Sequence, residues 1–255
     1  MTNDEVLHKR ENLTSALEQV WGLYEDTQRY FEQRPAGNRA ACPDLSMTVE
    51  RLVPSVLDSQ VARLETTSLS QLITLVNSCQ NCGLGATRIR AVPGEGAMNP
   101  RVMVIGEGPG ADEDASGRPF VGKAGQYLEK WLAAVGLSRD RNVYIANIVK
   151  CRPPGNRDPL PEEAAACIPY LKRQIQLVKP EAILCVGRIA AQFLLQKGEG
   201  VGLLRGRFHR FEGIPVLVTY HPAGVLRNTE LRGAVWDDMR QLAGFLQLTI
   251  PVRKG

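Results

Sequence analysis

The chain has 255 residues, of which 44% are hydrophobic, and its formal net charge is +4. This composition excludes a disordered chain, which would combine low hydrophobicity with a large charge excess, and it permits a nucleic-acid partner without requiring one. No apolar run approaches the roughly 18 residues of a membrane span. Because the polar start MTNDEVLHKREN also lacks the apolar core of a secretory signal, we expect a cytoplasmic protein without membrane contact.

The first 67 residues are expected to form an N-terminal helical extension and a linker. Apolar residues recur at helical spacing from Val6 to Phe31 and predict an amphipathic helix that ends before Pro35. The stretch 36–67 is rich in Pro, Gly, Asn and Ser and has no strong period, which is typical of a linker. The helix is read either as an intramolecular packing element or as a docking site for a protein partner. The second domain is expected at 68–255.

Short apolar runs alternate with helical patterns in the rest of the chain. Four runs read as buried strands: 101–107, 142–151, 181–187 and 214–220. Helical spacing follows them at 123–135, 161–178, 188–196 and 230–246. This βαβα order predicts a three-layer α/β/α sandwich around a central, mostly parallel four-stranded sheet. Ligands of such sheets bind beyond the carboxyl ends of the strands.

Four of the six cysteines are candidate metal ligands: Cys79, Cys82, Cys151 and Cys167. The first two form a C-x-x-C pair, and four thiolates suit either a tetrahedral zinc or a [4Fe-4S] cluster, so the spacing does not decide between them. The alternative is that the later two are buried apolar residues. Cys185 lies within a predicted strand and is expected to be inert core, and Cys42 receives no role.

The glycine-rich stretch after the first strand nearly fits two phosphate-binding motifs. Gly106, Gly108 and Ala111 match a dinucleotide fingerprint, but the carboxylates of Asp112–Asp114 would face the pyrophosphate. The following Walker-like loop ends at Ala124, which lacks the hydroxyl that binds magnesium. Nucleotide binding is therefore a minor alternative, and we expect no nucleotide cofactor.

Three residues of this region have side chains suited to holding a base. Glu107 projects from the end of the first strand, and Phe120 offers a flat apolar face that can stack on a base or, equally, plug the space beneath the loop. Asn147 ends the next strand, where a buried amide must find partners. Its donor and acceptor suit the O4 and N3–H edge of uracil and fit cytosine poorly.

His221 directly follows the last strand, where this architecture places chemistry, and residues 222–228 are expected to form the turn that leads to the final helix. The other two histidines, His8 and His209, are expected at the surface. Without further signals His221 would be read as a structural histidine that caps a strand. However, Leu226 and Arg227 follow it, and an apolar wedge beside a phosphate-binding cation is what a base-flipping enzyme needs at the duplex.

With these residues in view, the chain resembles the family 4 uracil-DNA glycosylases, the iron-sulfur branch of their superfamily. The resemblance covers about residues 69–246 and rests on the order and spacing of the four cysteines, on GEGPG, GRPFVG and NIVKCRPPGNR, and on HPAGVLRN. Family 5 has a neutral residue where Glu107 stands, and the covalent-trapping branch has a basic insertion that CRPPGNRDP lacks. Two departures are Gly224, where larger residues are usual, and the N-terminal extension.

The resemblance implies a role for each candidate residue. The four cysteines would hold a [4Fe-4S] cluster, Phe120 would stack on the flipped uracil, Asn147 would read its edge, and His221 would support the departing base. The remaining expected contacts are substrate binding by Gly106 and Gly108 and DNA binding by Val225, Leu226 and Arg227.

The implied activity is DNA repair by a monofunctional glycosylase. It would flip uracil out of single- or double-stranded DNA, hydrolyse the N-glycosidic bond and leave an abasic site. We expect Glu107 to activate the water, whereas the acidic run behind it is read mainly as a solvated loop surface. Two alternatives stay open, namely a non-catalytic iron-sulfur DNA-binding relative and a glycosylase for another deaminated base.

Overall fold

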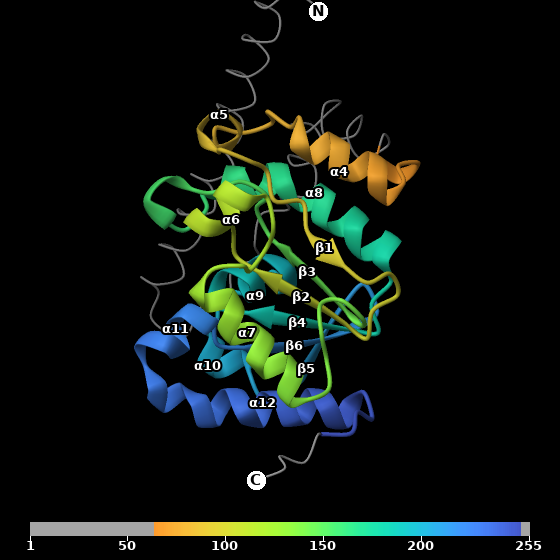
Figure 1. The fold of residues 1–255 in the computed structure, drawn as a ribbon, viewed down its shortest axis with the longest axis vertical. Coiled ribbons are helices and arrows are strands. Elements are labelled where there is room, and N and C mark those ends of the chain that lie inside the picture. Colours follow the sequence, from red (N-terminus) through yellow and green to blue (C-terminus); the bar gives the residue numbers. More distant parts are fainter. Residues whose placement is uncertain (1–63, 251–255) are drawn as a thin grey trace, which may run out of the picture. The chain divides into compact units, whose positions relative to one another are not determined.

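A six-stranded sheet forms the centre of residues 64–250, the part of the chain that the computed structural model describes (Figure 1). In spatial order the strands are β1 (Glu95–Gly96), β3 (Val143–Asn147), β2 (Val102–Gly106), β4 (Ala182–Val186), β6 (Ile214–Thr219) and β5 (Phe208–Phe211). The amphipathic N-terminal helix, the linker, His8 and Cys42 lie outside the described residues.

The four central strands β3, β2, β4 and β6 run parallel, as the sequence predicts. Strands β2, β3 and β4 are buried at every residue, which explains why each reads as a continuous apolar run. The two edge strands β1 and β5 pair antiparallel and extend the expected four-stranded sheet to six. β3 is shorter than the predicted 142–151, because it ends at Asn147 and the following residues only run beside the end of β2.

Helices cover both faces of the sheet. They are α4 (Leu69–Asn77), α5 (Leu84–Thr87), α6 (Ala111–Ser116), α7 (Lys123–Ala134), α8 (Pro161–Val178), α9 (Arg188–Leu195), α10 (Val201–Leu204), α11 (Pro222–Arg227) and α12 (Arg232–Phe245). Met103 and Ile105 of β2 pack with α4, α8 and α9, whereas the alternate residues Val102 and Val104 pack with α7 and α12. The sheet therefore lies between two helical layers, as Figure 1 shows for α8 and α12. The predicted three-layer sandwich is confirmed.

A short helix stands where the sequence predicts only a turn at 222–228. His221 is the N-cap of α11, and Pro222 occupies the first helical position, where its fixed φ and missing N–H are favourable. The last helix follows after a 3₁₀ turn, Thr229–Leu231, and begins two residues later than expected.

A buried polar network fixes the end of β6 just before His221. The Asp238 carboxylate on α12 accepts hydrogen bonds from Thr219 Oγ1 at 2.7 Å and from Arg205 Nε at 3.0 Å. Because the carboxylate is buried, these partners are needed to offset its desolvation. No helix within residues 64–250 is both long and apolar enough to span a bilayer.

Candidate active site

The predicted chemical residues meet at the carboxyl ends of the central strands. Gly106 ends β2 and lies directly opposite Asn147, the last residue of β3. His221 follows β6, and its ring centroid lies 5.8 Å from that of Phe120, which comes from the loop between α6 and α7. The structure thus brings together four residues that are up to 115 positions apart in the sequence.

Gly106 is required by this arrangement. A Cβ at this position would lie 2.5 Å from Asn147 Oδ1 and 2.6 Å from Phe120 Cζ, so the amide and the ring would have to shift. A Cβ on Gly108 would instead meet Val149 Cγ2 at 2.7 Å. Gly106 therefore lets the amide and the ring approach each other, whereas Gly108 lets two chain segments pack.

Asn147 presents an acceptor without a partner. The residue is buried, and its Oδ1 has no hydrogen bond within residues 64–250. Its main-chain carbonyl accepts a hydrogen bond of 2.8 Å from Lys150 Nζ. An orphaned buried oxygen costs about 1–3 kcal/mol, so this amide is in the state expected of a group that receives its donor from a ligand.

His221 is held as a neutral ring of defined tautomer. Its Nδ1 accepts a hydrogen bond of 3.2 Å from the Ala223 amide, so the proton of the neutral ring is on Nε2. Burial, with a smaller effect from the Arg227 charge, lowers the pKa of His221 to about 4. At neutral pH the site therefore contains an imidazole whose Nε2–H can donate.

Phe120 is buried, and its main chain adopts φ +53°, in the left-handed region that non-glycine residues rarely occupy. The burial fits a hydrophobic plug, and the position beside His221 and Gly106 fits a stacking platform. Its position is thus compatible with both expected roles.

Glu107 is the carboxylate nearest to these groups in the sequence. Burial raises its pKa to about 7, the Asp158 charge adds to the increase, and Arg188 opposes it.

Two of the acidic residues that follow Glu107 in the sequence are not part of a solvated loop surface, so that expectation is wrong for them. Glu113 accepts hydrogen bonds from main-chain amides of the loop, and Asp114 accepts one of 2.9 Å from the Ile89 amide.

The expected DNA-contacting residues separate into two groups on α11. Val225 has no exposed surface and packs in the core, so its side chain does not reach the outside of the protein. Leu226 is 42% exposed and Arg227 is exposed. Nothing lies within 4 Å of a Cβ built on Gly224, so the space for a larger residue exists there.

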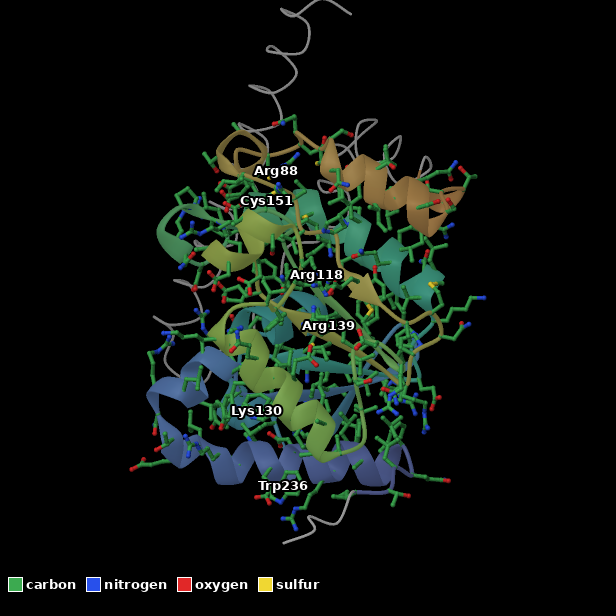
Figure 2. The ribbon with its side chains drawn as sticks, in the orientation of Figure 1. Arg88, Arg118, Lys130, Arg139, Cys151 and Trp236 are labelled. Carbon is green, nitrogen blue, oxygen red and sulfur yellow. The ribbon has the colours of Figure 1, made fainter. Side chains whose placement is uncertain are left out.

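The four candidate ligand cysteines line one pocket, together with Arg88, Lys150 and Tyr170. Three of the sulfurs receive a hydrogen bond: Cys151 from Arg88 at 3.1 Å, Cys167 from the Lys150 amide at 3.3 Å and Cys79 from the Tyr170 hydroxyl at 3.5 Å. Figure 2 shows Arg88 beside Cys151. Cys185 is fully buried in β4, which confirms it as core.

Comparisons with known proteins agree with this geometry. A family model described as the uracil DNA glycosylase superfamily matches residues 93–240. A Type-4 uracil-DNA glycosylase of Pyrobaculum aerophilum is 45% identical over 184 residues, 69% of this chain and 93% of the relative. One of Archaeoglobus fulgidus is 40% identical over 183 residues, 69% of this chain and 92% of the relative. This chain belongs to the type-4 uracil-DNA glycosylase family.

A relative from the type-5 branch allows the type-4 and type-5 matches to be compared. A Type-5 uracil-DNA glycosylase of Pyrobaculum aerophilum is 36% identical over 156 residues, which are 55% of this chain and 69% of the relative. The type-4 match is longer and closer. This result agrees with the sequence-based expectation that Glu107 favours the type-4 over the type-5 family.

The donor set of the cysteine pocket fits an iron-sulfur cluster, because four thiols line one space and such clusters are held by four cysteine thiolates. Within residues 64–250, no group of three or more His, Cys, Asp or Glu side chains is placed so that it could hold a metal ion.

Two supporting residues of this type-4 protein were not found from the sequence. Glu113 accepts from two amides of the loop before α7 and from the Gly110 amide before α6, and Arg139 donates to the carbonyls of Pro119 and Phe120. Arg139 belongs to no motif and lies 19 residues from Phe120, so no local pattern could have identified it.

Proposed function

We propose that this protein hydrolyses the N-glycosidic bond of uracil in DNA, releasing uracil and leaving an abasic site. The observation that carries the proposal is the orphaned Asn147 Oδ1 close to the ring of Phe120, which in turn lies beside the neutral ring of His221. The type-4 relatives, whose printed name is uracil-DNA glycosylase, support it.

Base recognition follows from the inventory of donors and acceptors. Uracil N3–H would supply the donor that Asn147 Oδ1 lacks, and the amide nitrogen would donate to O4. Cytosine has an acceptor at N3 and an amino group at C4, so both contacts would be mismatched at a cost of about 1–3 kcal/mol each. Phe120 would stack on the flipped base.

Cleavage leaves negative charge on the departing base. His221 Nε2–H is free to donate toward uracil O2 because Nδ1 is occupied by the Ala223 amide. Such a donor typically supplies about 2.7–4 kcal/mol of transition-state stabilisation. Glu107, with a pKa near 7, would accept the proton of the attacking water.

The DNA contacts are assigned to α11. Leu226 would enter the stack as an apolar wedge, and Arg227 would bind a phosphate. Val225 is left out, because it is core. The proposed substrate is single- or double-stranded DNA, and the proposed location is the cytoplasm.

The four cysteines would hold a [4Fe-4S] cluster. Burial raises the pKa of the Cys82, Cys151 and Cys167 thiols, so these thiols must lose their protons when they bind the cluster. The free energy of cluster binding would then contribute to the stability of the fold. Hydrolysis needs no electron transfer. The cluster would therefore join the segment before α5 to the end of β3 and to α8.

The proposal is tested by incubating the purified protein with labelled oligonucleotides that carry one uracil, cytosine, thymine or hypoxanthine, followed by alkaline cleavage. We expect scission at uracil alone, in single strands or opposite guanine. Scission at hypoxanthine only would show a glycosylase for another deaminated base. Tight binding of uracil DNA without scission would show a non-catalytic relative, and either result would refute the proposal.

A further inference from the structure

The loop that carries Phe120 is held in an unfavourable main-chain conformation. Phe120 has φ +53°, a conformation that is unfavourable for a non-glycine residue and persists only when the surroundings enforce it. A Cβ on Gly125 would lie 2.0 Å from the Phe120 carbonyl oxygen, so the first turn of α7 packs directly against this peptide.

Arg139, from the loop between α7 and β3, binds the same peptide. Its Nη1 donates to the Pro119 carbonyl at 2.6 Å, and its Nη2 donates to the Phe120 carbonyl at 2.8 Å. Two neighbouring carbonyls bound by one planar guanidinium define the orientation of the peptide between them. The Arg139 side chain is only 11% exposed, so water does not readily replace these donors.

Arg139 is itself held by two carboxylates. Glu129 of α7 accepts from its Nε at 2.7 Å, and Glu95 of β1 accepts from its Nη1. Glu113 completes the frame by accepting from the Val121 and Gly122 amides, both at 2.9 Å. Charged side chains therefore bind the carbonyls at one end of this short loop and the amides at the other.

We propose that Arg139 is a positioning residue for uracil excision. It acts through Phe120, by holding its left-handed peptide so that the ring lies beside His221 and Asn147 as a platform for the flipped base. The inference rests on the proposed function and deepens it, since it assigns the geometry of base recognition to an ion-pair network centred on Arg139, which lies outside the sequence motifs named above.

The test is a double-mutant cycle between Arg139→Met and Phe120→Ala in the full-length, cluster-containing protein. Single-turnover excision gives the maximal rate and the protein concentration at half-maximal rate. Phe120→Ala should raise that concentration about 5- to 150-fold, the range for loss of one base-aromatic stack. Arg139→Met should raise it about 5- to 50-fold, and the double variant should equal Phe120→Ala alone, because coupled residues are not additive.

Two further variants separate positioning from folding. Arg139→Lys keeps the charge between Glu95 and Glu129 but cannot bind both carbonyls, so it should fold normally and retain most of the defect. Arg118→Met is the matched control, because Arg118 also pairs with Glu95, at 2.9 Å, but is 59% exposed (Figure 2). It should excise uracil like the wild type.

Additive losses in the cycle, or wild-type kinetics of Arg139→Lys and Arg139→Met, would overturn the inference. A defect in Arg118→Met as large as that of Arg139→Met would also overturn it, since it would make the network merely structural. These outcomes differ from failure of the proposed function, in which the wild type itself would excise no uracil.

Discussion

At the scale of single residues, the site contains two titratable groups whose pKa values are shifted in opposite directions. Burial keeps His221 neutral by lowering its pKa to about 4, and burial raises the pKa of Glu107 to about 7. Between pH 5 and pH 8 the imidazole therefore does not change its charge. Of these two groups, only the carboxylate titrates in this range, so the proposed role of Glu107 predicts that catalysis follows its titration.

Single-turnover excision should fall as the pH decreases below about 7, approaching a tenfold loss per pH unit, because protonated Glu107 cannot accept a proton from water. Glu107→Gln should lower the rate at pH 8 by about 10²- to 10⁴-fold and abolish this slope. Rates measured from pH 5 to 8 check this. Parallel profiles for the two proteins would remove Glu107 from the chemistry.

The chemical residues were predictable because of where they stand in the chain. Asn147 and His221 come at or just after the ends of buried strands, and this position alone places them at one edge of the sheet. The side of α11 on which each residue lies was not predictable, because the sequence indicated a turn there. Val225 was therefore assigned to DNA although it packs in the core.

At the scale of elements, the cysteine pocket and the base site share one short segment. It runs from Asn147, the end of β3, to Cys151. Between them the buried Lys150 donates to the Asn147 carbonyl and, at 2.6 Å, to Gln174 of α8. Anchoring Cys151 therefore also anchors the residue that would read uracil.

Cys151→Ser should lose the visible absorption of the proposed iron-sulfur cluster and yield little folded protein, because the segment after β3 would no longer be joined to α8. The control is Cys185→Ala, a buried cysteine of β4 that does not line the pocket and should keep the absorption. Absorbance spectra and folded yield measure both. A stable, active Cys151→Ser protein without cluster would contradict the structural role.

The alternation of strands and helices could be predicted from the sequence, because β2, β3 and β4 are buried on both faces and are therefore continuously apolar. Short elements were missed. β1 has two residues and α11 has six, and neither is long enough to show a period. Their positions are set by pairing with β3 and by the N-cap at His221, which are properties of the folded chain.

At the scale of the whole molecule, the described residues 64–250 belong to one compact unit. Leu64 is buried in its core, and the Thr67 carbonyl accepts two hydrogen bonds from Arg173, at 3.2 and 2.9 Å. Residues 64–67 thus contribute to the glycosylase domain. A boundary at 67/68, the sequence-based expectation, would divide these contacts.

A chain that begins at residue 63 should excise uracil at the full-length rate, whereas one that begins at 68 should remain active but unfold at a lower temperature. Loss of buried Leu64 alone removes about 1.5–3 kcal/mol. Thermal denaturation and excision assays of the two truncated proteins test this. An inactive 63–255 protein would show that the first 62 residues belong to the catalytic unit.

The most direct test of the account is single-turnover excision of uracil by His221→Ala beside the wild type, with binding of uracil DNA measured in parallel. The rate should fall about 10²- to 10³-fold while DNA binding is retained, because the lost Nε2–H acts on the departing base. His209→Ala, in the β5 hairpin, should match the wild type. An unchanged rate, or loss of binding with normal cleavage of bound DNA, would contradict the assignment of His221.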